Sequence, residues 1–240
     1  MSIIEKLTEG IMSRNVQKEG QATCKKGCYN IKKYPFRDIV EDIFKVNDLS
    51  NFHVERKDLI PNYKLEFDNE SKTNIHKEFY DNLDLISEPF EKFITNEVAP
   101  YFDEDFVYQK TPSFRAHLPE EQAIHYWHYD ADEDHRHPFW EINFQIAITD
   151  MFKTNCTWIE SVPGLKDFFP MEMKYGEYVI FDGNKCLHGN KVNTTGKTRI
   201  SFDFRVIPFS RYSPEKYENV VSATKNNLFK VGGYYELFKK

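Results

Sequence analysis

The stretch TRISFDFRVI, residues 198–207, alternates polar and apolar side chains along almost its whole length. Because successive side chains of a β-strand point to opposite faces of a sheet, this alternation predicts a strand with one apolar and one polar face. The stretch EINFQIAIT, residues 141–149, repeats the pattern. The apolar faces comprise Ile200, Phe202, Phe204 and Val206 on the first strand and Ile142, Phe144, Ile146 and Ile148 on the second. The polar faces comprise Arg199, Ser201, Asp203 and Arg205 on the first strand and Glu141, Asn143, Gln145 and Thr149 on the second.

The polar faces of these strands have two interpretations. One is an antiparallel sheet whose polar side faces water. The other is a jelly roll whose apolar outer face is covered by helices and whose lumen is lined with polar groups. We favour the jelly roll, because Arg199 with Ser201 and His128 with Asp130 are same-face pairs of the types that line an anion site and a metal site.

The rest of the chain predicts more strands and one helix. Short runs rich in Phe, Ile, Val, Thr and Trp predict strands near residues 113–118, 123–130, 157–161, 178–181 and 185–190. Regularly spaced short strands of this kind indicate a sandwich or barrel. Ahead of them, apolar residues that recur at threes and fours predict an amphipathic helix over residues 74–102, ended by Pro100. The fold class that we expect is mainly β, with flanking α-helices.

The length of 240 residues suits one domain with a sizeable core. Hydrophobic residues at 40% and aromatic residues at 16% exclude a disordered chain. We expect a single domain over residues 1–240 in which residues 1–70 form an N-terminal extension packed on the core, 71–102 a supporting helix, 103–208 the jelly-roll catalytic core and 209–240 a C-terminal extension. Nothing in the C-terminal extension, which contains VGGYYELF, indicates chemistry.

The charge balance limits the partners of this chain. Its 38 acidic and 32 basic side chains give a formal net charge of −6, so it lacks the basic field that drives binding to nucleic acids. No stretch approaches the roughly 18 consecutive apolar residues of a membrane span. The start MSIIEKLTEGIMSR also lacks the apolar core of a secretory signal. We therefore expect a cytoplasmic protein without nucleic-acid or membrane partners.

The four cysteines are too few and too scattered for a disulfide scaffold, so we expect free thiols. They are Cys24, Cys28, Cys156 and Cys186. A metal held by the CKKGC spacing of Cys24 and Cys28 is the alternative, but zinc sites usually show a matching second pair, and this chain has none.

A set of metal-ligating residues gathers around the stretch HYWHYDADEDH, residues 125–135. On a strand, His128 and Asp130 leave from the same face and can reach one cation. An HxD pair alone is weak evidence for a metal site, because such pairs arise by chance. His53 and Glu55 form an HxE pair that is as easily explained by chance. His188, in FDGNKCLHGN, supplies a third ligand. Two imidazoles and one carboxylate leave coordination positions open, as in non-haem Fe(II) oxygenases.

Arg199 follows His188 at an interval that allows one strand to end, a turn over residues 193–197, and the next strand to run alongside it. Arg199 would then face the lumen near the metal. A buried guanidinium needs an anion, and a carboxylate fits its planar fork best. Ser201, on the same face, adds a hydroxyl. This arrangement indicates a seat for an acidic cosubstrate.

Taken together, these motifs resemble the Fe(II)/2-oxoglutarate-dependent oxygenases with a double-stranded β-helix core. The matching stretches are HYD at 128–130, WIESVPG at 158–164, YGEYVIFDGNKCLHGN at 175–190 and TRISFDFR at 198–205. The likeness covers residues 112–208. It is greatest to the phytanoyl-CoA-hydroxylase-like group, in the branch related to a streptomycin-biosynthesis oxygenase.

The resemblance implies roles for individual residues. His128, Asp130 and His188 would hold Fe(II), and Arg199 with Ser201 would bind the distal carboxylate of 2-oxoglutarate. Asn143 would assist at the cosubstrate, and Arg205 resembles a second arginine that in some members meets the cosubstrate or the aspartate ligand. The implied activity is an O2-dependent hydroxylation with release of succinate and CO2, with desaturation, ring closure and epimerisation left open. Halogenation is disfavoured, because halogenating members lack the carboxylate ligand and Asp130 is present here.

The substrate is less well indicated than the cofactors. The polar lumen suits a polar small molecule, and the branch resemblance implies an amino-sugar, sugar or amino acid derivative. The substrate-binding candidates are Arg205, Arg115, Trp140 and Glu141. For Arg115 a surface ion pair and an anion clamp remain equal alternatives. Two other functions also remain: a cupin-like metalloenzyme that does not use 2-oxoglutarate, and a non-catalytic jelly-roll binding module.

Two neighbouring features are interpreted as structural. His125 falls on the strand face opposite His128 and is expected to be a packed or surface histidine. The mixed-charge run over residues 132–137 is expected to be a solvated loop over the barrel mouth, and a second metal site there is the alternative.

Overall fold

The two alternating strands lie side by side at the centre of one antiparallel sheet. The computed structural model describes residues 24–63, 71–123, 126–217, 219–222 and 227–240. The strands are β4 (Ile142–Ala147) and β9 (Arg199–Pro208). Their register pairs Asn143 with Arg205 and Gln145 with Asp203, so the polar residues of both strands share one face.

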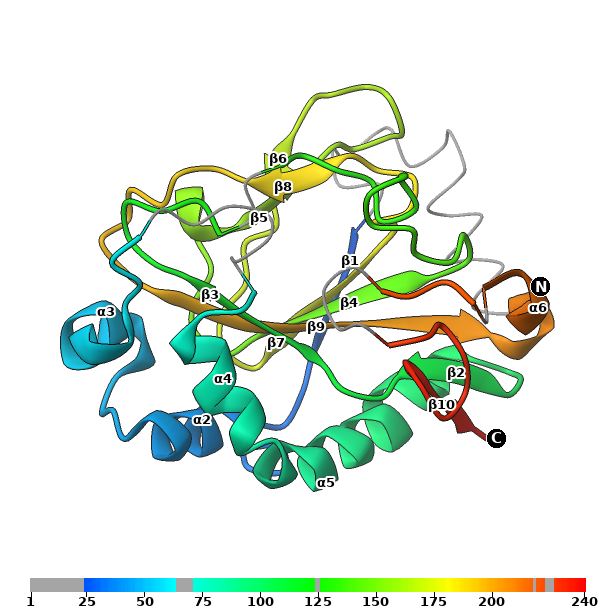
Figure 1. Cartoon of the computed structure of the whole chain (residues 1–240), viewed down its shortest axis with the longest axis horizontal. Coiled ribbons are helices and arrows are strands. Elements are labelled where there is room, and N and C mark those ends of the chain that lie inside the picture. Colours follow the sequence, from blue (N-terminus) through cyan, green and yellow to red (C-terminus); the bar gives the residue numbers. More distant parts are fainter. Residues whose placement is uncertain (1–23, 64–70, 124–125, 218, 223–226) are drawn as a thin grey trace.

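The large sheet continues on both sides of this pair. Its strand order is β1 (Cys24–Cys28), β7 (Glu177–Phe181), β4, β9, β2 (Phe106–Gln109) and β10 (Tyr235–Phe238), with β3 (Ser113–His117) also paired to β9. A smaller sheet has the order β6 (Phe169–Pro170), β5 (Thr157–Ile159) and β8 (His188–Asn190). In Figure 1 the smaller sheet lies on one side of the large sheet and the helices lie on the other.

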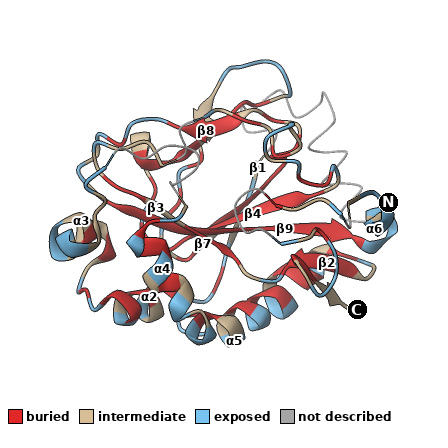
Figure 2. Cartoon of the chain, in the orientation of Figure 1, coloured by how far each residue is buried: buried red, intermediate tan, exposed pale blue. Residues whose placement is uncertain are grey.

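Three helices cover the apolar face of the large sheet: α2 (Phe36–Phe44), α4 (Asn74–Asp81) and α5 (Asp84–Phe93). One phenylalanine of each packs on β9, at ring centroid distances of 5.7 Å for Phe36 and Phe202, 5.5 Å for Phe79 and Phe202, and 5.1 Å for Phe90 and Phe204. Figure 2 shows these helices buried toward the sheet and exposed on the outside. The apolar stripe therefore packs against the sheet, as its spacing predicts.

The remaining helices are short and lie between these elements. They are α3 (Phe52–Glu55), α6 (Pro214–Tyr217) and the 3-10 helices Leu49–Asn51, Lys57–Leu59, Lys153–Asn155 and Phe209–Arg211. None of the helices among the described residues has the length and apolar character that a membrane crossing requires. Cys28, Cys156 and Cys186 are free thiols, and Cys24 and Cys28 lie on one strand, β1.

The polar face of β9 is buried, which confirms the lumen interpretation and excludes a sheet face in water. Arg199 is 1% exposed and Asp203 is 6% exposed. The smaller sheet lies over this face. The polar side chains of β9 therefore lie in the interior of the protein, between the two sheets (Figure 1).

The prediction of one continuous helix over residues 74–102 is wrong, because the structure has two separate α-helices there. Thr73 caps α4 by accepting a hydrogen bond from the His76 N–H, and the helix ends where the Asn82 side chain donates to the Glu78 carbonyl oxygen at 2.9 Å. The chain then starts α5 and finishes in a π-helical turn, Ile94–Val98, and a 3-10 helix, Ala99–Tyr101. Pro89 within α5 has no N–H to donate to the preceding turn, which weakens a continuous helix here.

Among the described residues, one expected strand is also absent and another begins later than predicted. Residues 123–130 form no strand in their described part, where His128 makes only an isolated bridge to His188. The expected strand over 185–190 begins at His188, because the preceding residues form a turn closed by the Cys186 N–H on the Asp182 carbonyl oxygen at 3.0 Å. His125 lies outside the described residues.

Candidate metal centre

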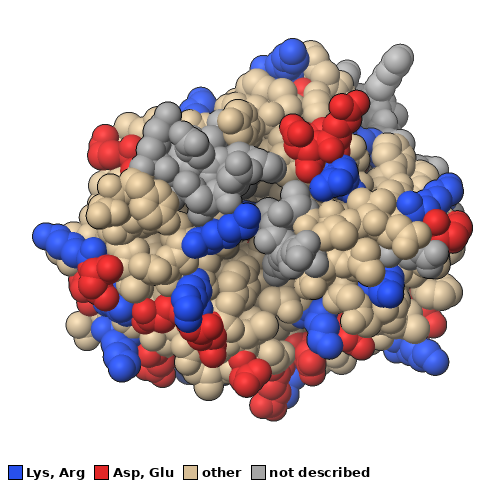
Figure 3. Space-filling model, in the orientation of Figure 1, with Lys and Arg blue, Asp and Glu red and all other residues tan. Residues whose placement is uncertain are grey.

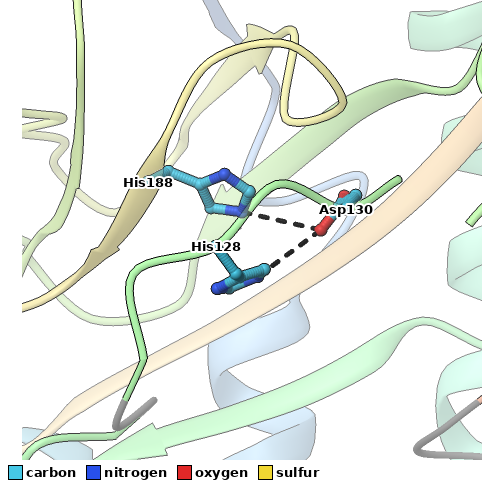
Figure 4. Close-up of side chains that lie close together, drawn as sticks. All are labelled: His128, Asp130 and His188. Carbon is cyan, nitrogen blue, oxygen red and sulfur yellow. Dashed lines mark ion pairs between the residues drawn. The ribbon is translucent and has the colours of Figure 1, made fainter. Parts of the chain in front are cut away.

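An isolated bridge between two distant segments brings two histidines together. The His128 N–H donates to the His188 carbonyl oxygen at 2.9 Å, and the His188 N–H donates to the His128 carbonyl oxygen at 3.1 Å. Asp130 is fixed by its own N–H, which donates to the Gly183 carbonyl oxygen at 2.9 Å. The Nε2 atoms of His128 and His188 lie 3.5 and 3.6 Å from one carboxylate oxygen, Asp130 Oδ1 (Figure 4). Three buried side chains thus direct ligand atoms to one point.

Hydrogen bonds select the tautomer in which both imidazoles can bind a metal. His128 Nδ1 lies 3.1 Å from the carbonyl oxygen of Tyr126, and His188 Nδ1 lies 3.1 Å from that of Cys186. A carbonyl oxygen only accepts, so each Nδ1 carries the proton and each Nε2 presents its lone pair. This is the usual support of a histidine metal ligand. Burial lowers the pKa of His188 to about 3, which keeps it neutral as a ligand must be.

Asp130 presents one oxygen to the histidines and uses the other for support. Its Oδ2 accepts hydrogen bonds from Asn143 Nδ2 at 2.6 Å and from Arg205 Nε and Nη2 at 3.2 and 3.1 Å. Burial opposes its charge, but the Arg205 guanidinium holds the pKa of the Asp130 carboxyl well below its usual value. Oδ1 is buried and accepts no hydrogen bond from the described residues. A charged oxygen of this kind requires a cation, so the donor set fits a divalent metal ion.

Gly183 and Asn143 form the support on the other side of Asp130. The Gly183 N–H donates to Asn143 Oδ1 at 3.2 Å. A Cβ at position 183 would lie 2.8 Å from Asn143 Nδ2, so a side chain there would displace the amide that holds Asp130. Asn143 thus contacts the aspartate of the triad, and its role at the cosubstrate stays a prediction.

Arg199 lines the same lumen, and its hydrogen-bond partners among the described residues are neutral groups. Its Nη2 donates to Asn190 Oδ1 at 2.8 Å, its Nη1 to Ser201 Oγ at 2.9 Å and its Nε to the Asn155 carbonyl oxygen at 3.1 Å. Among the described residues no carboxylate lies within ion-pair distance of it. Burial lowers the pKa of the Arg199 guanidinium to about 10. A buried cation without a counter-charge is a binding site for an anion.

One cavity joins the histidines to this arginine. It is lined by His128, His188 and Arg199, and also by Gln145 of β4. Two amide donors near Arg199, Asn155 Nδ2 and Asn190 Nδ2, are buried and lack a partner in the described part of the chain. Asn190 was missed from the sequence, although it follows His188 by two residues on β8 and must share its face.

The other sequence candidates are placed in different surroundings. Arg115 is neither on the surface nor unpaired: its Nε lies 2.8 Å from Asp203 Oδ1, and both side chains are largely buried. Trp140 lies under Arg211, whose guanidinium is 4.6 Å from the ring centroid, and Lys185 lies 5.5 Å from the same ring. Arg115 lines the cavity of the metal centre, whereas Trp140 does not line it and packs against the apolar cluster that includes Phe229 and Tyr235.

Glu141 and Arg205 belong to a buried polar network. The Tyr235 hydroxyl donates to Glu141 Oε1, and His137 Nδ1 lies 2.8 Å from Glu141 Oε2. Arg205 bridges Asp130 and Asp203, with Nη1 2.8 Å from Asp203 Oδ2. These contacts tie both residues to other protein groups.

The segment over residues 132–137 is only partly the solvated loop that was expected. Glu133 and Asp134 are exposed, but His137 is buried on Glu141. His135 stacks on the ring of His128, with centroids 4.1 Å apart and an interplanar angle of 20°. The described residues contain no second group of metal-ligating side chains here beyond His128, Asp130 and His188.

The fold and the site define the class of protein to which this chain is similar. The structure matches that of EctD from S. alaskensis, solved with 2-oxoglutarate and 5-hydroxyectoine, with a TM-score of 0.52 and 13% identity over 83% of this chain and 77% of EctD. This chain thus has the double-stranded β-helix fold of the Fe(II)/2-oxoglutarate-dependent oxygenases, as predicted.

A particular relative is found by sequence. The streptomycin biosynthesis protein StrG of Streptomyces griseus is 29% identical to this chain over 208 residues, which cover 87% of this chain and 95% of StrG. No family model matches the chain. The expected likeness to the streptomycin-biosynthesis branch is confirmed by this relative.

Proposed function

We propose that this protein is an Fe(II)- and 2-oxoglutarate-dependent oxygenase that hydroxylates a polar small molecule. The observation that carries the proposal is one cavity lined at one end by His128 and His188 beside Asp130, and at the other by the uncompensated Arg199. A metal site alone fits many reactions. A metal site next to a buried cation that lacks an anion fits a chelating dicarboxylate.

The residues of the chain divide the work between metal and cosubstrate. His128, Asp130 and His188 would hold Fe(II), with Asn143 and Arg205 keeping the second oxygen of Asp130 occupied. Arg199 and Ser201 would bind the distal carboxylate of 2-oxoglutarate, and the partnerless Asn190 Nδ2 would donate to it. When bound, iron and 2-oxoglutarate supply the oxidation, in which O2 places one oxygen atom on the substrate and the other in succinate as CO2 leaves.

The substrate class follows from the lumen and from the relatives. The cavity is lined by Arg115, Gln145 and Asp203 besides the residues above, and it lacks a long apolar wall. StrG is a streptomycin biosynthesis protein, and the EctD structure contains 5-hydroxyectoine. We therefore propose an amino-sugar, sugar or amino acid derivative as substrate, with Arg115 as the residue that contacts it. Trp140 and Glu141 stay predicted substrate contacts.

The outer surface gives no support to a nucleic-acid partner. In Figure 3 the described Lys and Arg side chains alternate with Asp and Glu on the visible face and form no continuous basic band. The net charge of −6 agrees with this distribution.

The test is anaerobic addition of Fe(II) and then of 2-oxoglutarate, with visible absorption as the readout. The proposed function requires a metal-to-ligand charge-transfer band that appears only after both additions. Iron binding without the band would favour a cupin-like metalloenzyme, and no iron binding would favour a ligand-binding module. His188→Ala should abolish the band. The matched control is His53→Ala, because His53 contacts Thr198 and lies outside the triad.

A further inference from the structure

Two tyrosines of the C-terminal segment extend into the polar network behind the metal centre. Tyr235 is the first residue of β10, and Tyr234 directly precedes this strand. They are 0% and 3% exposed and lie far along the chain from the triad. The Tyr235 hydroxyl donates to Glu141 Oε1. The Tyr234 hydroxyl donates to Gln109 Oε1 at 2.8 Å. Each tyrosine therefore fixes one acceptor in the interior.

Both of these acceptors face Arg205. Gln109 Oε1 accepts a second hydrogen bond from Arg205 Nη1 at 3.4 Å, and Glu141 Oε2 lies 3.9 Å from Arg205 Nε. Arg205 in turn donates to Asp130 Oδ2 through Nε and Nη2. A path of direct contacts thus runs from each tyrosine to the carboxylate of the metal site.

Three buried carboxylates compete for the Arg205 guanidinium. Asp130 and Asp203 hold it at 3.1 and 2.8 Å, whereas Glu141 remains at 3.9 Å. In a low-dielectric interior a cation moves toward the anion whose charge is least compensated. Glu141 stays away because both of its oxygens are occupied, Oε1 by the Tyr235 hydroxyl and Oε2 by His137.

The tyrosines are suited to this task because they remain donors. Burial raises the pKa of both phenols well above the usual value, so neither hydroxyl ionises near neutral pH. Gln109 is oriented on its other side by Nε2, which donates to the Thr111 carbonyl oxygen at 2.7 Å. Other contacts therefore help Tyr234 to orient Gln109, whereas the Tyr235 hydroxyl is the sole hydroxyl that donates to Glu141 Oε1 among the described residues.

We infer that Tyr235, and to a smaller extent Tyr234, are positioning residues for the metal ligand Asp130, acting through Arg205. Tyr235 occupies Glu141, which leaves Arg205 on Asp130 Oδ2, and Asp130 then offers only Oδ1 to the metal. Through Tyr235, the C-terminal segment helps to orient a ligand of the metal centre. The inference rests on the proposed function, since it takes Asp130 as a metal ligand.

The test compares Co(II) binding to the full-length wild type and to Tyr235→Phe, followed by the visible ligand-field absorption of the bound ion. Direct supports of metal ligands change affinity by about 10- to 100-fold. Arg205 is the direct support of Asp130, and Tyr235 is connected to Arg205 through Glu141. We therefore expect the smaller effect of a fall of about 3- to 10-fold in Co(II) affinity, with a changed absorption spectrum. Tyr234→Phe should cause a smaller change of the same kind.

The matched control is Tyr178→Phe. Tyr178 is 3% exposed, and its hydroxyl lies 3.0 Å from that of Tyr101 on the helix-covered side of the sheet. This substitution also removes one buried hydroxyl, so it reproduces any general loss of stability. Its Co(II) affinity and spectrum should equal those of the wild type.

A second background tests the route of the effect. In Glu141→Gln the competing charge is gone, so adding Tyr235→Phe should weaken Co(II) binding no further, which is a non-additive double-mutant cycle. If Tyr235→Phe does not fold, Tyr234→Phe and Glu141→Gln carry the comparison.

The outcomes separate this inference from the proposed function. A wild type that binds no Co(II) at the triad overturns the proposed function. A wild type that binds Co(II), with Tyr235→Phe and Tyr234→Phe matching Tyr178→Phe in affinity and spectrum, overturns the positioning role and leaves the proposed function intact.

Discussion

Arg199 and Arg205 lie on the same face of β9, and both are buried, at 1% and 5% exposure. Their surroundings differ in charge. Arg205 bridges the carboxylates of Asp130 and Asp203, whereas Arg199 contacts an amide, a hydroxyl and a backbone carbonyl. Burial opposes both charges, yet Asp130 raises the pKa of Arg205 well above its usual value, while that of Arg199 falls to about 10.

The two arginines differ in how the protein compensates their charge. The charge of Arg205 is compensated by two carboxylates of the protein, whereas Arg199 has no carboxylate partner among the described residues. This difference is the reason why we propose Arg199 as the residue that binds the anion, since an anion would offset its desolvation cost. Binding sites often contain groups that lower the stability of the ligand-free protein, and an uncompensated buried charge is such a group.

The largest expected effect is on Arg205→Met. This substitution leaves Asp130 and Asp203 buried with less counter-charge, and breaking a buried ion pair in this way costs about 3–5 kcal/mol. Urea denaturation should show the free energy of unfolding fall by this amount. The control is Arg199→Met. It removes a guanidinium that is similarly buried but has no carboxylate partner among the described residues. Equal losses in the two variants would remove the distinction between these arginines.

Arg199→Met should instead act on the cosubstrate. Loss of one member of a buried charge pair weakens binding by about 2 kcal/mol or more, which is roughly 30-fold in affinity. The measurement is titration of the charge-transfer band with 2-oxoglutarate, together with iron affinity, which should not change. The free energy of unfolding of the ligand-free variant should equal or exceed that of the wild type. Unchanged 2-oxoglutarate affinity would mean that the seat lies elsewhere.

Asn190→Asp would make the two arginines alike. It places a carboxylate on Arg199 Nη2, where the Asn190 amide oxygen now accepts at 2.8 Å. A charge-assisted bond inside the protein should stabilise the ligand-free state and lower 2-oxoglutarate affinity about tenfold or more. Thermal unfolding and the band titration measure both effects. Asn190→Ala is the control, since it should weaken 2-oxoglutarate binding without stabilising the protein.

The comparison also shows what the sequence can and cannot predict. The alternation in residues 198–207 was sufficient to place Arg199, Ser201 and Arg205 on one face, because strand geometry makes that face a local property. The apolar stripe likewise predicted which surfaces the helices cover. The likeness of WIESVPG and TRISFDFR to the oxygenases predicted the fold that the structure shows.

The acceptors of each arginine could not be predicted, because they depend on register and on contacts between distant segments. Asn143 lies opposite Arg205 in the register of β4 and β9, and both donate to Asp130, which belongs to neither strand. His128 meets His188 through an isolated bridge, where the local pattern indicated a full strand. Tyr235 and Glu141 are 94 residues apart in the sequence, and no periodicity links them. Side-chain competition in the lumen is a tertiary property.

The smallest expected effect concerns the far end of the compensated network, where Arg115 pairs with Asp203. Burial, and then the charge of Arg115, lower the pKa of His76 from 6.5 to about 4. The unfolded chain therefore binds the extra proton first as pH falls, so stability that is present above pH 6.5 is lost between pH 6.5 and about 4. Between pH 7 and 5.5 this single histidine should lower the free energy of unfolding by about 1 kcal/mol. Urea denaturation at several pH values should show a shallower decline in His76→Gln than in the wild type, and parallel declines would show that His76 is not the group that titrates.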